Sequence, residues 1–188
     1  MRALDTLAGK LLIAAPTMGD SRFRETLIYM CVHSQHRAMG LVINQPMQDL
    51  ILPDLLGQLG IECTIEVPRR PVLAGGPVDK DRGFVLHSDD YFCDDGTLRV
   101  AQGISMTATK DVLEAIGNSP RPHRAVLALG YAGWGPGQLE HELEENAWLI
   151  ADADARTVFG LDHRTKWKRA YTTLGFDAAR FAPGVGRA

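Results

Sequence analysis

The chain has 188 residues, of which 45% are hydrophobic and 23% are charged, a composition typical of globular proteins. Its 20 Lys and Arg residues stand against 23 Asp and Glu residues, so the formal net charge is -3. These values exclude a strongly basic nucleic-acid coat and an acidic disordered tail, and the length predicts one domain spanning residues 1–188.

The cysteines and the N-terminal residues predict a cytoplasmic protein. Cys31, Cys63 and Cys93 are odd in number and form no CxxC pair, which favours a reducing compartment. The apolar run Leu11–Ala15 is too short for the core of a signal peptide or for a membrane-spanning helix. We therefore expect no membrane association.

Short apolar segments predict a sheet with helices packed on it. The expected strands are Leu11–Ala15, Leu27–Val32, Met39–Ile43, Pro71–Ala74, Gly83–His87, Thr97–Val100, Ala125–Leu129 and Trp148–Ala151. The second and third of these read as an antiparallel hairpin. Helical spacing of apolar residues predicts helices at 52–59, 109–116, 139–147 and 162–174. Because strands outnumber helices and do not alternate with them, we predict an α+β fold with a mixed, largely antiparallel sheet.

A glycine-rich string joins an apolar strand to an amphipathic helix between Leu129 and Glu140. Its four glycines are Gly130, Gly133, Gly135 and Gly137. This arrangement can bind phosphate at a helix N-terminus, so a nucleotide or another phosphate-bearing ligand is one hypothesis. However, four acidic residues open the helix, and they would repel phosphate. The structural alternative is that the glycines allow positive φ and let backbone pass close to Trp134 or a neighbouring strand. If the loop is a contact surface for a partner, Trp134 is expected to be an exposed anchor.

A second candidate surface is the turn Gly75-Gly76-Pro77 and the strand that follows it. Arg82 and His87 are the polar residues that could line a site there. The structural interpretation is that Arg82 pairs with Asp79 or Asp81 and that His87 is a satisfied, partly buried histidine. Neighbouring strand residues point to opposite faces, so His87 and the serine after it cannot form a nucleophile–base pair.

The distribution of charge bears on nucleic acid and metal binding. Residues 155–188 carry seven basic and two acidic residues, and this basic C-terminal end offers weak nucleic-acid binding as a further alternative. The apolar face of helix 162–174 is expected to hold Trp167 and Tyr171, with the basic residues on the solvated face. His141 lies at helical spacing from Glu144 and Glu145, but no second histidine is near, so we predict no metal site.

Taken together, the strings resemble the AlgH/YqgE family of bacterial proteins. The resemblance rests on residues 9–14, 16–20, 39–46, 75–78, 82–88, 129–140 and 146–149, in this order, and extends to Trp167 and Leu174-Gly175. It implies a compact α/β-type domain with mixed sheets flanked by helices. It also implies a role in the regulation of transcription, and it implies no enzymatic activity.

The residues contain no nucleophile–base pair, no metal cluster and no complete phosphate loop. We therefore expect a non-enzymatic regulatory or partner-binding protein that uses no cofactor and has a protein as its partner. Small-molecule binding at the glycine string is the alternative. The candidate binding surface comprises Gly75, Gly76, Pro77, Arg82, His87, Gly130, Gly133, Trp134, Gly135, Gly137 and Glu140.

Overall fold

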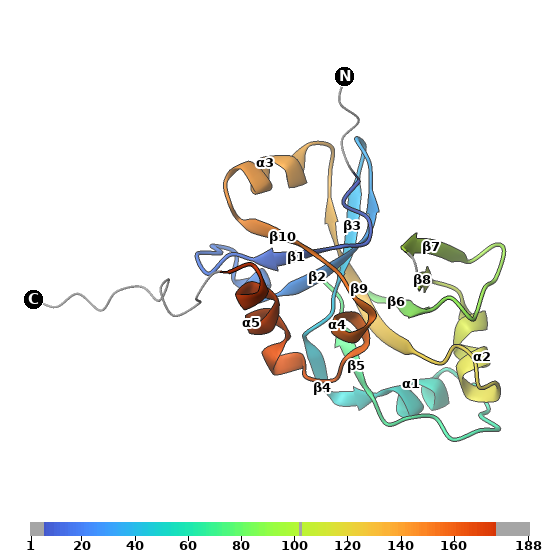
Figure 1. Cartoon of the computed structure of the whole chain (residues 1–188). Coiled ribbons are helices and arrows are strands. Elements are labelled where there is room, and N and C mark those ends of the chain that lie inside the picture. The colour runs from blue at the N-terminus through green and yellow to red at the C-terminus, as the bar shows by residue number, and fades with distance from the viewer. Residues whose placement is uncertain (1–5, 102, 176–188) are drawn as a thin grey trace, which may run out of the picture.

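The computed structural model describes residues 6–101 and 103–175, which form a curled sheet with helices on its faces (Figure 1). The strands are β1 (Lys10–Ala14), β2 (Leu27–His33), β3 (Ala38–Val42), β4 (Pro46–Ile51), β5 (Pro71–Ala74), β6 (Val78–Ser88), β7 (Thr97–Ala101), β8 (Ile104–Thr107), β9 (Ala125–Trp134) and β10 (Trp148–Asp152). The main path of the sheet runs β10-β1-β2-β3-β9-β6-β8-β7. Every neighbouring pair along this path is antiparallel, whereas β5 joins β9 in parallel and pairs with β4 on its other side.

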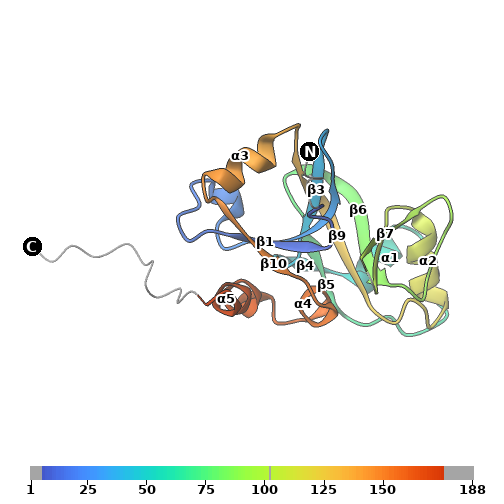
Figure 2. The same cartoon turned by 45° about the horizontal axis from the view of Figure 1, so that its top comes forward.

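The helices cover different parts of this sheet. They are α1 (Leu52–Gln58), α2 (Lys110–Asn118), α3 (Gln138–Glu144), α4 (Ala155–Phe159) and α5 (His163–Thr173), and a 3-10 turn spans Ser21–Phe23. Figure 2 shows α3 on one side of β1 and β10, with α4 and α5 on the opposite side. Helices α1 and α2 lie at the far end, where they pack against β5, β6 and β9.

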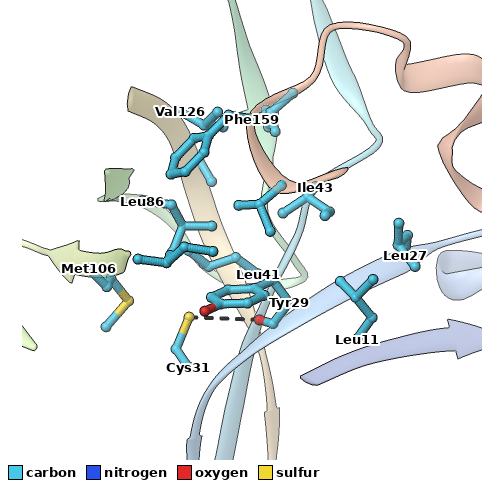
Figure 3. Packing of buried hydrophobic residues seen from close by; sticks show 14 of the residues in the cluster. Leu11, Leu27, Tyr29, Cys31, Leu41, Ile43, Leu86, Met106, Val126 and Phe159 are labelled. Carbon is cyan, nitrogen blue, oxygen red and sulfur yellow. Dashed lines mark hydrogen bonds between the residues drawn. The ribbon is translucent and has the colours of Figure 1, made fainter. Parts of the chain in front are cut away.

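Period-two alternation distributes the strand residues between separate hydrophobic clusters. In β1, Leu11 and Ile13 join the cluster under α4 and α5, whereas Leu12 and Ala14 join the cluster beneath α3. Because both faces are covered, this strand is a continuous apolar run rather than an alternating one. Figure 3 shows the first cluster, in which side chains from β1, β2, β3, β6, β8 and β9 converge with Phe159 from α4.

The predicted α+β class and largely antiparallel sheet are confirmed. Each predicted strand and helix lies at an observed element, but β9 runs five residues beyond the predicted end at Leu129, as far as Trp134. Two strands, β4 and β8, one α-helix, α4, and the 3-10 turn were not predicted. Strand β4 begins with a proline and its first four residues are exposed, so its sequence has no apolar alternation. In the part of the chain that the structure describes, no helix is long and apolar enough to cross a membrane.

Candidate functional site

Three of the predicted surface glycines form a close backbone crossing. The turn between β5 and β6 passes directly over β9, where Gly75 N–H donates to the Leu129 carbonyl at 2.8 Å. A Cβ at Gly75 would clash with the Gly130 carbonyl, and a Cβ at Gly76 would clash with the backbone of Tyr131. These glycines are therefore required by the close approach of two backbones. For Gly130 this agrees with the structural alternative, which expected its string to pass close to a neighbouring strand.

The crossing is followed by a large bulge that positions Arg82. Val78 pairs with Tyr131 and Gly83 pairs with Leu129, so four residues of β6 lie opposite the single residue Gly130 of β9. Gly130 has a φ of +75°, and its missing Cβ leaves room for the bulged backbone. Arg82 is the last residue of this bulge, and its guanidinium lies over the Phe84 ring at 5.1 Å from the centroid.

Beside the bulge lies a cavity of about 540 Å³, which we call the arginine cavity. Its apolar lining comes from β2, β3, β6, β7, β8 and β9, and its charged lining residues are Arg37 and Arg82. Val78 and Leu98 also line it while remaining 37% and 40% exposed, which is high for aliphatic residues. Among the described residues, no carboxylate forms an ion pair with either arginine. The predicted pairing of Arg82 with Asp79 or Asp81 is therefore wrong.

A second cavity of about 360 Å³, the tryptophan cavity, shares Val78, Gly133 and Trp134 with the arginine cavity. It is lined by Phe23, Trp134 and Trp148 and by the carboxylate of Glu142 on α3. Glu142 Oε2 accepts hydrogen bonds from the indole N–H of Trp134 at 2.8 Å and of Trp148 at 2.7 Å. The carboxylate thus fixes both rings through charge-assisted hydrogen bonds.

Trp134 is 5% exposed, so the prediction that it forms an exposed anchor is wrong. Sequence reasoning placed it in a loop, but it is the last residue of β9, and it packs against Trp148 and Leu139. The turn is confined to residues 135–137. In that turn Gly137 adopts a left-handed conformation, and Gly135 N–H donates to the Gln138 side chain at 3.1 Å. That amide is therefore occupied by the side chain of the residue that follows the turn.

Of the remaining predicted residues, Pro77 lines the tryptophan cavity, whereas His87 and Glu140 lie outside both cavities. His87 is fully buried and hydrogen-bonded to Thr107 Oγ1 at 2.8 Å and to the Ser88 carbonyl at 2.9 Å, and burial lowers its pKa. This agrees with the structural interpretation of a satisfied histidine. Glu140 accepts from His33 Nε2 at 2.9 Å, a hydrogen bond that lowers the pKa of the carboxyl and ties α3 to β2. Sequence reasoning gave no signal for this pair, which is 107 residues apart.

The basic C-terminal helix is less cationic at its surface than predicted. Lys166 is 4% exposed and donates to the carbonyls of Ile43 at 2.9 Å and Val158 at 3.4 Å. Arg169 pairs with Asp162 at 3.4 Å. The predicted apolar face is confirmed, because Trp167 and Tyr171 stack with ring centroids 5.4 Å apart and pack against the core.

Among residues 6–101 and 103–175, no three His, Cys, Asp or Glu side chains are grouped so that they could hold a metal ion. His141 instead lies 3.4 Å from Glu145 on the exposed side of α3. The two cavities bring together residues that the sequence analysis did not select, namely Arg37, Phe23, Glu142 and Trp148. A tryptophan at the start of an apolar strand pattern is the signal that could have pointed to Trp148.

The fold and the cavities together define an α+β protein with a curled, mostly antiparallel sheet and two concave sites that meet at the end of β9. The AlgH-like family model, DUF179, matches residues 11–179, and the chain belongs to this family. It is 49% identical over 183 residues to a UPF0301 protein of Caulobacter vibrioides, covering 97% of this chain and 94% of the relative. A UPF0301 protein of Bradyrhizobium diazoefficiens is 48% identical over 189 residues, with 97% and 88% covered.

Two solved structures share the fold. The solution structure of the AlgH protein from Pseudomonas aeruginosa superposes with a TM-score of 0.75 at 37% identity, covering 100% of this chain and 99% of that one. A crystal structure of a protein from Corynebacterium diphtheriae has a TM-score of 0.71 at 19% identity, with 98% and 95% covered. The family resemblance identified from the sequence strings is thereby confirmed.

Proposed function

We propose that this protein is a non-catalytic binding protein and that the arginine cavity takes a small molecule with an apolar body and an anionic head. One observation carries the proposal: Arg37 and Arg82 line an apolar cavity without a described carboxylate partner. A volume of about 540 Å³ falls in the range of small-molecule sites.

The chemistry of the lining supports this ligand class. Guanidinium groups bind carboxylates and phosphates through paired N–H donors, and such hydrogen bonds are stronger than neutral ones. The aliphatic and aromatic walls favour an alkyl or aryl body, because burying Val78 and Leu98 removes apolar surface from water. The sequence resemblance implies a regulatory role. In such a role, binding of the anionic small molecule in this cavity would be the event that the protein senses.

The test is calorimetric titration with octanoate, octyl phosphate and the neutral octan-1-ol as probes. We expect the two anions to bind at least about tenfold more tightly than the alcohol, because the alcohol lacks the charge that the arginines recognise. The substitutions Arg37→Gln and Arg82→Gln should each remove most of that difference. The matched control is Arg69→Gln, an exposed arginine outside the cavity, which should change nothing.

Equal affinity for octanoate and octan-1-ol would refute the anion site, as would unchanged octanoate binding in both cavity variants. The protein partner expected from the sequence stays a prediction. Such a partner would contact the protein at the exposed side chains of Val78 and Leu98, which line the arginine cavity.

A further inference from the structure

The left-handed residue Gly130 changes the face of the sheet on which the side chains of β9 lie. Before it, the even-numbered residues Val126 and Ala128 join the cluster under α4 and α5. After it, the odd-numbered Tyr131 packs on that cluster, whereas Trp134 joins the cluster beneath α3. Regular alternation would have placed Tyr131 on the opposite face, toward α1 and α2. The bulge at Gly130 therefore brings Tyr131 into the lining of the arginine cavity.

One aromatic ring supports both Tyr131 and Arg82. The Tyr131 ring meets the Phe84 ring edge-on, with centroids 5.6 Å apart at 77°, and the Arg82 guanidinium lies over the same Phe84 ring. Gly133 leaves space for the Tyr131 ring, because a Cβ there would come within 3.0 Å of Tyr131 Cε2. The guanidinium packs on Phe84 through its face, so its N–H edges are left to donate to a ligand. Tyr131 and Arg82 thus form one wall of the cavity.

The Tyr131 hydroxyl is an unused hydrogen-bonding group of this cavity. The residue is half-buried, and no hydrogen bond joins its hydroxyl to the residues that the structure describes. It is not enclosed like the hydroxyl of Tyr29, which is buried without a partner. The Trp134 indole N–H, which belongs to the same lining, is already donated to Glu142. Tyr131 therefore supplies a third polar group for a ligand, beside the two guanidinium groups.

The number of donors distinguishes between anionic heads. A guanidinium that binds an anion through one edge donates two N–H bonds, so two guanidiniums and a hydroxyl supply about five donors. A carboxylate has two oxygens with about four lone-pair sites, which the two guanidiniums fill by themselves. A phosphate or sulfonate has a third terminal oxygen and can therefore accept from the hydroxyl as well.

We infer that the arginine cavity takes an organic phosphate or sulfonate in preference to a carboxylate, and that Tyr131 determines this preference. The inference rests on the proposed function, because it needs Arg37 and Arg82 to bind the head of the ligand. The Tyr131 hydroxyl donates to the oxygen that the two guanidiniums leave unpaired. The alkyl or aryl body lies against the apolar walls.

The test is calorimetric titration with octane-1-sulfonate, octyl phosphate and octanoate. Octane-1-sulfonate and octanoate each carry a single negative charge, so comparing them separates the number of oxygens from the charge. We expect both three-oxygen heads to bind at least about tenfold more tightly than octanoate, because a hydrogen bond to a charged group changes affinity by about that factor or more.

The matched variant is Tyr131→Phe, which removes the hydroxyl and keeps the ring against Phe84. We expect it to weaken the binding of octane-1-sulfonate about tenfold and that of octanoate less than about threefold. The control is Tyr91→Phe, which removes the hydroxyl of a tyrosine that packs against His87 outside the cavity and should leave both affinities unchanged.

Two results would overturn the inference while leaving the proposed function intact. One is octanoate binding as tightly as octane-1-sulfonate to the unmodified protein, a comparison that holds even if Tyr131→Phe does not fold. The other is a folded Tyr131→Phe protein in which the affinities for both ligands fall by the same factor or do not change. If no anion binds more tightly than octan-1-ol, the anion site itself is absent and the inference fails with it.

Discussion

The buried amine of Lys166 makes the free energy of unfolding depend on pH above neutrality. Its Nζ is enclosed between α5, α4 and the end of β3, where it donates to the carbonyls of Ile43 and Val158. Burial disfavours the charged form and lowers the pKa of Lys166 from 10.5 to about 8, an effect that Asp162 opposes only in part.

The direction and size of the effect follow from proton linkage. Between the folded pKa of about 8 and the unfolded value of 10.5, the unfolded chain binds more protons than the folded protein, so stability rises with pH. A change of one pKa unit corresponds to about 1.4 kcal/mol, and Lys166 therefore contributes a gain of about 1.5 kcal/mol between pH 8 and pH 9.5. Below pH 8 the contribution levels off, because the amine is then protonated in both states.

The assay is urea unfolding of the unmodified protein and of Lys166→Met at both pH values. The quantity compared is the unfolding free energy of the unmodified protein minus that of Lys166→Met. We expect this difference to increase by about 1.5 kcal/mol between pH 8 and pH 9.5. Using the difference cancels the opposing contribution of Cys31, whose pKa burial raises in both proteins. The control, Lys168→Met, removes an exposed amine on the same helix, and the gain should be larger for Lys166→Met than for this control.

An unchanged difference between Lys166→Met and the unmodified protein at pH 8 and pH 9.5 would refute the reasoning. It would mean that the pKa of Lys166 is the same in the folded and unfolded states, because water reaches the amine in the folded protein. A change of the opposite sign would mean that the carbonyls of Ile43 and Val158 favour the charged form more than burial disfavours it.

Two further substitutions test the packing. Gly76→Ala should lower the free energy of unfolding by about 3 kcal/mol or more, because the new Cβ would overlap the Tyr131 backbone. Gly135→Ala, which has no atom within 4 Å of the new Cβ, should stay within about 0.5 kcal/mol in the same urea assay; similar losses in both would contradict the crossing. Tyr29→Phe should raise the free energy of unfolding by about 1 kcal/mol and therefore raise the melting temperature. The reason is that the buried hydroxyl has no hydrogen-bond partner among the described residues. A clear destabilisation would reveal a partner for that hydroxyl.

The fold was largely predictable because its signals are local. Apolar runs such as Leu27–Val32 are buried on both faces, and the helical stripe of Trp167 and Tyr171 packs on the core as its spacing indicated. Strand β4 escaped prediction because it opens with Pro46 and is mostly exposed, so hydrogen bonding to β5 defines it instead of burial.

The candidate site was predictable only in part. Close backbone approach was predicted for the string that contains Gly130, whereas Gly75-Gly76 was interpreted only as a turn; the contact between them depends on β5, β6 and β9 pairing in one sheet. The exposure of Trp134 was misjudged because the burial of a strand end depends on what covers it, in this case Trp148 and α3.

By itself, the sequence determined the family, the α+β class and which segments are buried, because side-chain periodicity and turn residues act over a few positions. Tertiary structure alone decided which charged groups meet. It brings Arg37 and Arg82 to one cavity, places Glu142 between two indoles and buries Lys166 among carbonyls. Such contacts join residues far apart in the chain, and they depend on strand pairing and on the bulge in β6, which no local pattern encodes.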